Sequence, residues 1–340
     1  MSTPKAPTSD PLRPDGYTEG LPGSPQRRDD VLARVLQEYD LLGLLQQQNE
    51  KRQAALKKFQ EMEEGRLGGR VGVLAFFCSE SLGASIDSDD VPPITDALLS
   101  IGDVDTLDLI IAGPGGDGTT AEKIVSLCRA YCGKLRVVIP NRAKSAATIV
   151  ALGADTIVMG FCSELGPIDA QVPVVVGGIP RYISAQSFID AREELEARFK
   201  EAVAKKEDPR AVLQQLATMD QSYIDHCRKL MGFSRDVAEK FLREYMFKAD
   251  TNERSRGAKI KKVLKALSTV DDFKVHGRLI NAHRARHDLK LDVELLPKDD
   301  DVWKQLWQYY VRADTSLSQT GHAKLVETPG TSFIKGKTTW

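Results

Sequence analysis

The sequence lacks several features that would place it in a specialised class of protein. It has no run of 18 apolar residues, so we expect no membrane-spanning helix. Its five cysteines are irregularly spaced, which excludes a disulfide framework and favours a reducing compartment. Lys and Arg (47) balance Asp and Glu (48), so the charge does not indicate nucleic acid or an anionic membrane as a partner. No apolar signal-peptide core follows the N-terminus. We therefore expect a cytoplasmic protein.

Composition divides the chain into segments of different character. Residues 1–28 hold six of the sixteen prolines and too few apolar side chains to offset the entropy of ordering, which predicts a disordered leader. Residues 29–66 have helical periodicity and form an expected N-terminal helical arm. Residues 67–313 are predicted to form one α/β domain that contains a charged helical segment over 185–270. The polar residues 314–340 are predicted to be a flexible tail.

The fold class follows from apolar runs that alternate with helical patterns. Short β-branched runs occur at 71–77, 107–112, 135–139 and 156–159. Amphipathic helical patterns lie between them, most clearly over 119–131. Alternation of this kind predicts a mostly parallel sheet with helical crossovers, and thus an α/β core of βα units.

A glycine-rich loop follows the second of these strands, with the sequence GPGGDG at 113–118. The letters satisfy the dinucleotide-binding pattern G-x-G-x-x-G, but three features disfavour that interpretation. Pro114 removes an amide from the turn, no acidic residue ends the next strand, and a βα unit precedes the loop. A purely structural turn is a second interpretation. The third is that Gly115 and Gly116 present bare amides that stabilise an oxyanion.

The next βα unit places Ser145 at a loop-to-helix junction between small residues. Serine is a favoured helix N-cap, so a capping role alone is one interpretation. However, loops after neighbouring parallel strands meet at one edge of the sheet, where active sites gather. The hydroxyl of Ser145 would then face the glycine loop, and the amide of Ala146 would join Gly115 and Gly116 in an oxyanion hole.

These motifs resemble the Clp-protease/crotonase superfamily, and within it the serine dehydrogenase proteinase family, relatives of signal peptide peptidase A. The strong part of the resemblance covers about 65 residues, through segments 113–116, 138–140, 143–155 and 165–171. A weaker part covers 276–282 and 289–291. The resemblance implies a crotonase-like fold, Ser145 as nucleophile, hydrolysis of peptide bonds and a ring or stacked homo-oligomer.

The base that would activate Ser145 is less clear from the sequence. The Clp proteolytic subunit has a histidine where this chain has Asp169, and its triad aspartate lies in the late segment, where this chain has His276. A swapped triad of Ser145, His276 and Asp169 is therefore one hypothesis, because the chemistry needs three roles and not a chain order. Lysine-dependent relatives suggest Lys200 as an alternative base, although its charged surroundings also fit a solvated helix face. Asp169 and His276 also fit ordinary loop positions.

No cofactor or metal is expected. The chain has no Walker loop and no C-x-x-C motif, and the pair His283 and His287 lacks an evident third ligand. The first hypothesis is a soluble serine peptidase that acts on peptide or protein substrates. The alternatives are a non-catalytic scaffold that keeps the fold but has lost the base, and a crotonase-type acyl-CoA enzyme that needs no nucleophile.

Overall fold

The computed structural model describes residues 43–80, 84–268 and 279–336. The chain divides into two compact units, residues 1–45 and 46–340. The leader predicted for residues 1–28 lies outside the described residues, as does the first part of the predicted arm. The described part of the arm is one helix, α2 (Gly43–Leu67).

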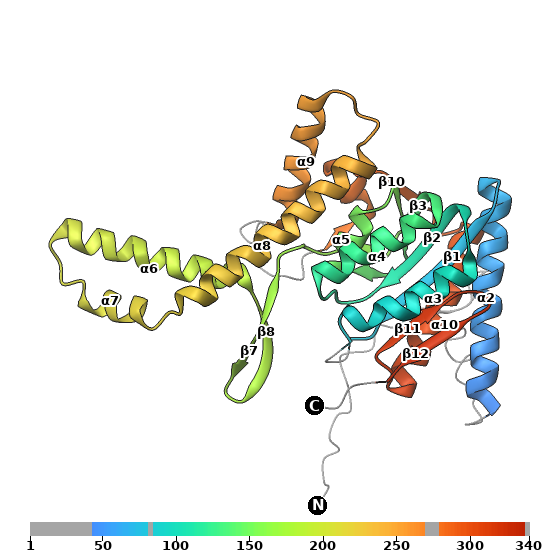
Figure 1. The fold of residues 1–340 in the computed structure, drawn as a ribbon, viewed down its shortest axis with the longest axis horizontal. Coiled ribbons are helices and arrows are strands. Elements are labelled where there is room, and N and C mark those ends of the chain that lie inside the picture. Colours follow the sequence, from blue (N-terminus) through green and yellow to red (C-terminus); the bar gives the residue numbers. More distant parts are fainter. Residues whose placement is uncertain (1–42, 81–83, 269–278, 337–340) are drawn as a thin grey trace, which may run out of the picture. The chain divides into compact units, whose positions relative to one another are not determined.

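A seven-stranded sheet forms the centre of the fold, in the order β10-β5-β3-β2-β1-β11-β12 (Figure 1). The five strands β10, β5, β3, β2 and β1 run parallel to one another, whereas β11 pairs antiparallel with β1 and β12 pairs antiparallel with β11. Their bounds are β1 (Val71–Cys78), β2 (Val104–Ala112), β3 (Cys132–Ile139), β5 (Thr156–Gly160), β10 (Val293–Leu296), β11 (Lys324–Glu327) and β12 (Ser332–Lys335). The predicted fold class, an α/β protein with a mostly parallel sheet, is confirmed.

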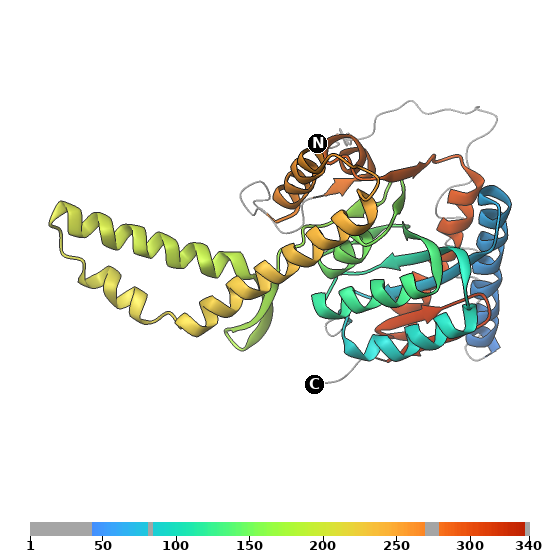
Figure 2. The same ribbon diagram turned by 45° about the horizontal axis from the view of Figure 1, so that its top comes forward.

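Helices cover both faces of this sheet, which explains why the central strands are almost continuously apolar. In β1, Leu74 and Phe76 belong to the core under α3 (Val91–Ile101), α4 (Gly118–Ala130) and α5 (Ala146–Leu152). The alternating residues Val73 and Phe77 belong to a second core with α2 and α10 (Asp301–Thr320). Figures 1 and 2 show α2 and α10 on the face opposite to α3 and α4.

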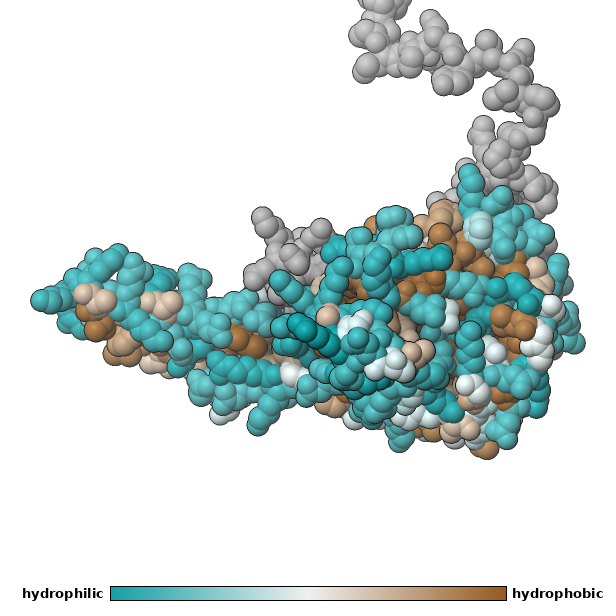
Figure 3. Space-filling model, turned by 90° about the horizontal axis from the view of Figure 1, so that it is seen from above, coloured by the Kyte–Doolittle hydropathy of each residue, from teal (hydrophilic) through white to brown (hydrophobic). Residues whose placement is uncertain are grey.

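A mainly helical segment lies between the core strands β5 and β10 in the chain. It begins with the hairpin β7 (Gln171–Val176) and β8 (Ile179–Ser184) and continues through α6 (Ala185–Lys205), α7 (Arg210–Ala217), α8 (Gln221–Phe241) and α9 (Glu253–Ser268). Helix α6 packs against α8, and α8 packs against α5. The α6–α7 part is mainly hydrophilic in the view of Figure 3. No described helix combines the length and apolarity needed to cross a bilayer.

The C-terminal region differs from the flexible tail predicted for residues 314–340. Helix α10 continues to Thr320, and β11 pairs with β1, so the domain does not end at residue 313. The prediction failed because β11 buries two charged side chains, Lys324 and Glu327, that make this stretch look solvent-exposed. Their partners come from distant parts of the chain. Arg52 of α2 donates to Glu327 at 2.8 Å, and Lys324 binds Asp90 at 2.8 Å.

Candidate active site

Two loops meet at one edge of the sheet, where the parallel neighbours β2 and β3 end. The loop after β2 carries the glycines, and the loop after β3 leads through β4 (Arg142–Ala143) to Ser145 and α5. Backbone hydrogen bonds join them. The N–H of Gly113 donates to the carbonyl of Arg142 at 3.1 Å, and the N–H of Lys144 donates to the carbonyl of Gly113 at 3.2 Å. The glycine loop is thereby fixed beside the residue that precedes Ser145.

Ser145 has an unusual backbone conformation, with φ 48° and ψ −117°. Positive φ in a residue other than glycine costs on the order of 1–3 kcal/mol and is concentrated at functional sites. The backbone is held in place because the N–H of Ser145 donates to the carbonyl of Pro167 at 3.1 Å. Thr148, one turn into α5, adds a hydrogen bond to the carbonyl of Ala143 at 2.7 Å.

The side chain of Ser145 is half-buried and precedes α5 without capping it. Its hydroxyl makes no hydrogen bond with any of the described residues. The interpretation of Ser145 as only an N-cap is therefore wrong for the described structure. The hydroxyl is held at a strained turn and is partly exposed.

The glycine loop lies directly against this turn. Gly115 has φ 109°, and a Cβ placed on it would lie 2.6 Å from Cβ of Ser145 and 3.0 Å from N of Ala146. Gly116 has φ 148°, and a Cβ there would lie 2.3 Å from the carbonyl oxygen of Ile86. Both positions thus need glycine for conformation and for close approach.

The amides of this region divide into two groups. Those next to the glycines are occupied, because Ile86 donates to the Gly115 carbonyl at 2.7 Å and Asp117 donates to the Ile86 carbonyl at 2.8 Å. By contrast, the N–H groups of Gly115, Gly116 and Ala146 donate none of the backbone hydrogen bonds that the described residues make outside helices and strands. Amides of this kind beside a reacting carbonyl can receive negative charge.

An ion cluster lies next to Ile86, the residue that bonds to the glycine loop, and the sequence analysis did not predict it. Lys324 of β11 is 2% exposed, and its Nζ lies 2.7 Å from Asp87 and 2.8 Å from Asp90. Burial raises the pKa of Asp90 above its ordinary value, against the opposing effect of the Lys324 ammonium. Asp87 directly follows Ile86, the residue that bonds to the glycine loop. No local signal could have revealed the cluster, because 234 residues separate Lys324 from Asp90.

Asp169 lies on the chain segment that passes the serine turn. It is two residues beyond Pro167, whose carbonyl accepts the Ser145 N–H, and it is 3% exposed. Its neighbours are tied to the helical segment, since the N–H of Ile168 donates to the carbonyl of Leu267 at 2.9 Å. The structure therefore places Asp169 near the serine backbone, in a buried position.

His276 lies outside the described residues. On either side of it, the described chain contacts the same segment: Leu267 bonds to Ile168, and Ile280 pairs with Leu165. The pair His283 and His287 is exposed, with ring centroids 4.5 Å apart. The described residues contain no group of three His, Cys, Asp or Glu side chains arranged to hold a metal ion.

The lysines offer no described partner for Ser145. Lys200 lies on an exposed face of α6, and Figures 1 and 2 show α6 extending away from α5. Lys144 adjoins the serine in sequence, but its Nζ lies 2.5 Å from a carboxylate oxygen of Glu164. The structure thus brings together Ser145, Gly115, Gly116 and Ala146, and it does not bring Lys200 to them within one chain.

Fold and site define an α/β protein in which a serine, held at a strained helix entrance, faces a glycine loop. Residues 45–194 match the family described as ClpP-like SDH-type serine proteinase, a segment that contains both loops and Asp169. This match confirms the resemblance predicted from the sequence.

Two curated relatives share a shorter segment. Uncharacterized protein MJ0137 of Methanocaldococcus jannaschii is 41% identical over 66 residues, and Uncharacterized protein MJ1495 of the same organism is 38% identical over 66 residues. Each alignment covers 19% of this chain and 23% of the relative. The chain thus spans about a quarter of the length of these relatives.

Solved structures give weaker similarity. A mutant of the 1510-N membrane-bound stomatin-specific protease aligns with 14% identity and a TM-score of 0.25, over 42% of this chain and 66% of that one. An enoyl-CoA hydratase from Mycobacterium avium subsp. paratuberculosis aligns with 12% identity and a TM-score of 0.25, over 62% of this chain and 96% of that one. Superpositions with such scores carry no weight for function.

Proposed function

We propose that the protein is a serine peptidase that cleaves peptide bonds through an acyl-enzyme on Ser145. The observation that carries the proposal is the close approach of the Gly115 backbone to the strained Ser145 turn. The N–H groups of Gly115, Gly116 and Ala146 would hold the oxyanion, whereas the N–H of Ser145 is already bonded to Pro167.

The reaction proceeds in two steps, acylation and deacylation of Ser145. Ser145 Oγ bonds to the carbonyl carbon, its proton passes to a base, and the C–N bond then breaks as the base protonates the leaving amine. Water next attacks the ester while the same base takes its proton. The bond between the acyl carbon and Oγ then breaks, the base returns the proton to Oγ, and the acid leaves. The three amides stabilise the negative oxygen in both steps.

The base in this proposal is His276, oriented by Asp169. Leu267 and Ile280, which precede and follow His276 in the chain, bond to the segment 165–168 beside the serine turn, and Asp169 extends that segment. Lys200, by contrast, lies exposed on α6.

A homo-oligomer is also part of the proposal. The hairpin β7–β8 pairs with no other strand of the described residues, and Val175 and Tyr182 on it are 73% and 56% exposed. An isolated two-stranded hairpin is only marginally stable in water, so a second copy would supply the missing contacts. Light scattering after size exclusion should show a Val175→Asp variant at lower mass than the wild type. An unchanged mass would exclude this hairpin as the contact.

Labelling with a fluorophosphonate probe tests the nucleophile. We expect the full-length protein to be labelled on Ser145, and the Ser145→Ala variant to be unlabelled and unable to hydrolyse fluorescent casein. Absence of labelling in the wild type would favour the scaffold alternative. Thioester turnover that survives Ser145→Ala would favour the acyl-CoA alternative.

A matched pair of variants tests the base. His276→Ala should lower the labelling rate by roughly 10²–10⁴-fold because general-base catalysis is lost, whereas Lys200→Ala should leave it unchanged. Asp169→Asn should lower the rate while the fold is retained, as measured by circular dichroism. A reversed order of the effects for His276 and Lys200 would overturn the assignment.

A further inference from the structure

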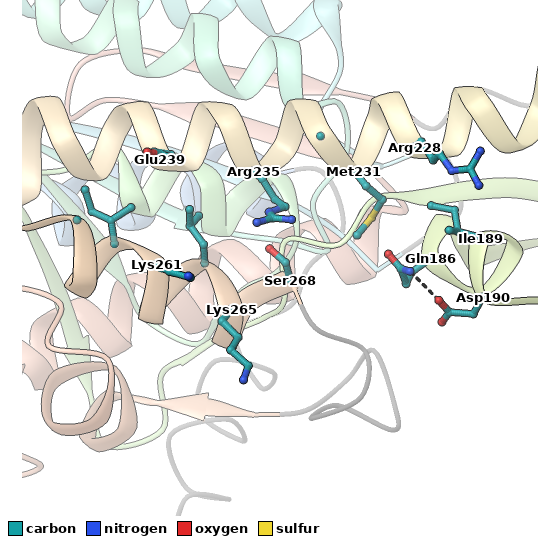
Figure 4. A pocket seen from close by; sticks show the side chains of 14 residues that line it. Gln186, Ile189, Asp190, Arg228, Met231, Arg235, Glu239, Lys261, Lys265 and Ser268 are labelled. Atoms are coloured by element: carbon teal, nitrogen blue, oxygen red, sulfur yellow. Dashed lines mark hydrogen bonds between the residues drawn. The ribbon is translucent and has the colours of Figure 1, made fainter. Parts of the chain in front are cut away.

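A large open pocket lies between α6, α8 and α9, outside the serine site (Figure 4). Its volume is about 810 Å³, at the upper end of the range for ligand sites. Apolar side chains from all three helices line it: Ile189, Met231, Ile260 and Leu264. Each of these four is buried to at least 93%, so they form a firm apolar floor.

The rim of the pocket is mainly basic. Arg228 and Arg235 come from α8, and Lys261 and Lys265 come from α9, a helix with six basic residues and one acidic residue. Figure 4 shows Arg235 directed from α8 into the space in front of α9. Within the described residues, no carboxylate lies within ion-pair distance of Arg235 or Lys261.

Part of the rim charge is already paired, because Arg228 lies 3.1 Å from Asp225, a residue outside the pocket. Asp190 accepts a hydrogen bond from Gln186 at 2.7 Å, and Glu239 pairs with Arg243 at 3.1 Å. Arg243 is not part of the pocket. The positive charge available to an anionic partner therefore comes from Arg235 on α8 and Lys261 on α9.

The pocket is connected to the serine site through its own walls. Met231 accepts a hydrogen bond from the N–H of Ala170 through its sulfur, at 3.3 Å. Leu267 of α9 accepts the N–H of Ile168. These two bonds lie on either side of Asp169, so the helices of the pocket hold the segment that passes the serine turn.

The positions of the charges indicate what kind of anion would fit. Arg235 lies on the α8 wall of the pocket and Lys261 on the α9 wall. The buried apolar side chains lie between them, in a volume of about 810 Å³ that is larger than one phosphate or carboxylate group needs. Charges spread along two walls above an apolar floor suit a polypeptide with several carboxylates and apolar anchors.

We propose that this pocket is an exosite that binds an acidic, apolar-anchored segment of a polypeptide substrate, next to the segment that carries Asp169. The role in substrate selection rests on the proposed peptidase function, whereas the binding itself does not. The exosite favours substrates whose cleaved region lies near a stretch in which acidic and large apolar residues alternate.

Binding is measured on full-length Ser145→Ala protein, so that no cleavage interferes. The probe is a fluorescein-labelled peptide of about 16 residues with Glu and Leu at helical spacing, and binding is followed by anisotropy. We expect binding that weakens as salt is added. The same peptide with Lys in place of Glu should not bind, because like charges across an interface oppose association.

Two double variants separate the pocket from the general charge of the helices. Arg235→Glu with Lys261→Glu should weaken binding at least roughly tenfold, since both charges face the peptide. The control is Lys229→Glu with Lys262→Glu, which makes the same change of charge on the same two helices. These two lysines are exposed and do not line the pocket, so affinity should change less than about threefold. Circular dichroism and thermal unfolding check that both remain folded.

The outcomes are distinct from those of the peptidase test. If the peptide binds but the wild type is not labelled by fluorophosphonate, the peptidase proposal fails and the binding site stands. The exosite is overturned if labelling is normal but the peptide fails to bind, or if it binds equally well in its Lys form. It is also overturned if oleate displaces the labelled peptide as effectively as the unlabelled peptide does. In protein that keeps Ser145, Arg235→Glu with Lys261→Glu should raise the KM for casein fused to the Glu and Leu peptide. The rate of fluorophosphonate labelling should stay unchanged.

Discussion

Replacement of Gly115 by alanine tests the geometry on which the proposed site depends. The added Cβ would lie 2.6 Å from both Cβ of Ser145 and the carbonyl oxygen of Lys144. Carbon atoms in contact prefer 3.5–4.0 Å, so either the glycine loop or the serine turn must move by about 1 Å. Neither can move freely, because Gly113 and Lys144 are joined by a backbone hydrogen bond.

The expected loss of reactivity follows from this displacement. Oxyanion donors act at about 2.7–3.1 Å, and removal of one donor costs about 10²–10³-fold in kcat. We therefore expect Gly115→Ala to lower the fluorophosphonate labelling rate and casein hydrolysis by roughly 100- to 1000-fold. Overpacking and the φ of 109° should also lower the free energy of unfolding by on the order of 1–3 kcal/mol, measured by urea denaturation.

A second glycine provides the matched control. Gly321 ends α10 with φ 68°, and a Cβ there would meet no atom within 4 Å. Gly321→Ala should therefore lose roughly 1–2 kcal/mol from backbone conformation and keep the wild-type labelling rate. If Gly115→Ala reacts within a few-fold of the wild type, the glycine amides are not part of the reaction and the proposed oxyanion hole is wrong.

Three further predictions concern strain, pH and buried charge. The free energy of unfolding from urea denaturation should be about 0.5–2 kcal/mol higher for Ser145→Gly than for Ser145→Ala. The reason is that relief of the positive φ outweighs the added flexibility of the unfolded chain. Equal stability would mean that the turn is unstrained. Burial raises the pKa of Asp108 to about 7, so the folded state binds more protons than the unfolded state between about pH 4 and 7. Stability should fall as pH rises through this range, by at most about 1.4 kcal/mol per pH unit, and urea titrations should show a flatter profile for Asp108→Asn but not for the exposed control Asp103→Asn. Lys324→Met should cost about 3–5 kcal/mol by leaving Asp90 buried without its cation, and adding Asp90→Asn should restore much of that loss; an additive loss instead would show that the pair is not coupled.

The sequence alone was sufficient for the features that depend on local chemistry. Apolar runs alternating with amphipathic helices predicted the parallel strands, because a strand covered on both faces must be apolar throughout. The glycine loop and Ser145 could also be predicted from local sequence. Each is a short motif at a strand end, and neighbouring parallel strands bring their ends together.

Only the tertiary structure decided the features that depend on partners far apart in the chain. The C-terminal strands read as a polar tail because Lys324 and Glu327 gain their partners, Asp90 and Arg52, only after folding. The conformation of Ser145 is likewise imposed by Pro167 and by the approach of Gly115, not by its own preference. The basic pocket arises because three helices that each read as ordinary amphipathic surface leave a hollow where they pack. Local pattern determines which elements form and where motifs fall, whereas burial of charge, strain and cavities are set by contacts between segments that the sequence separates.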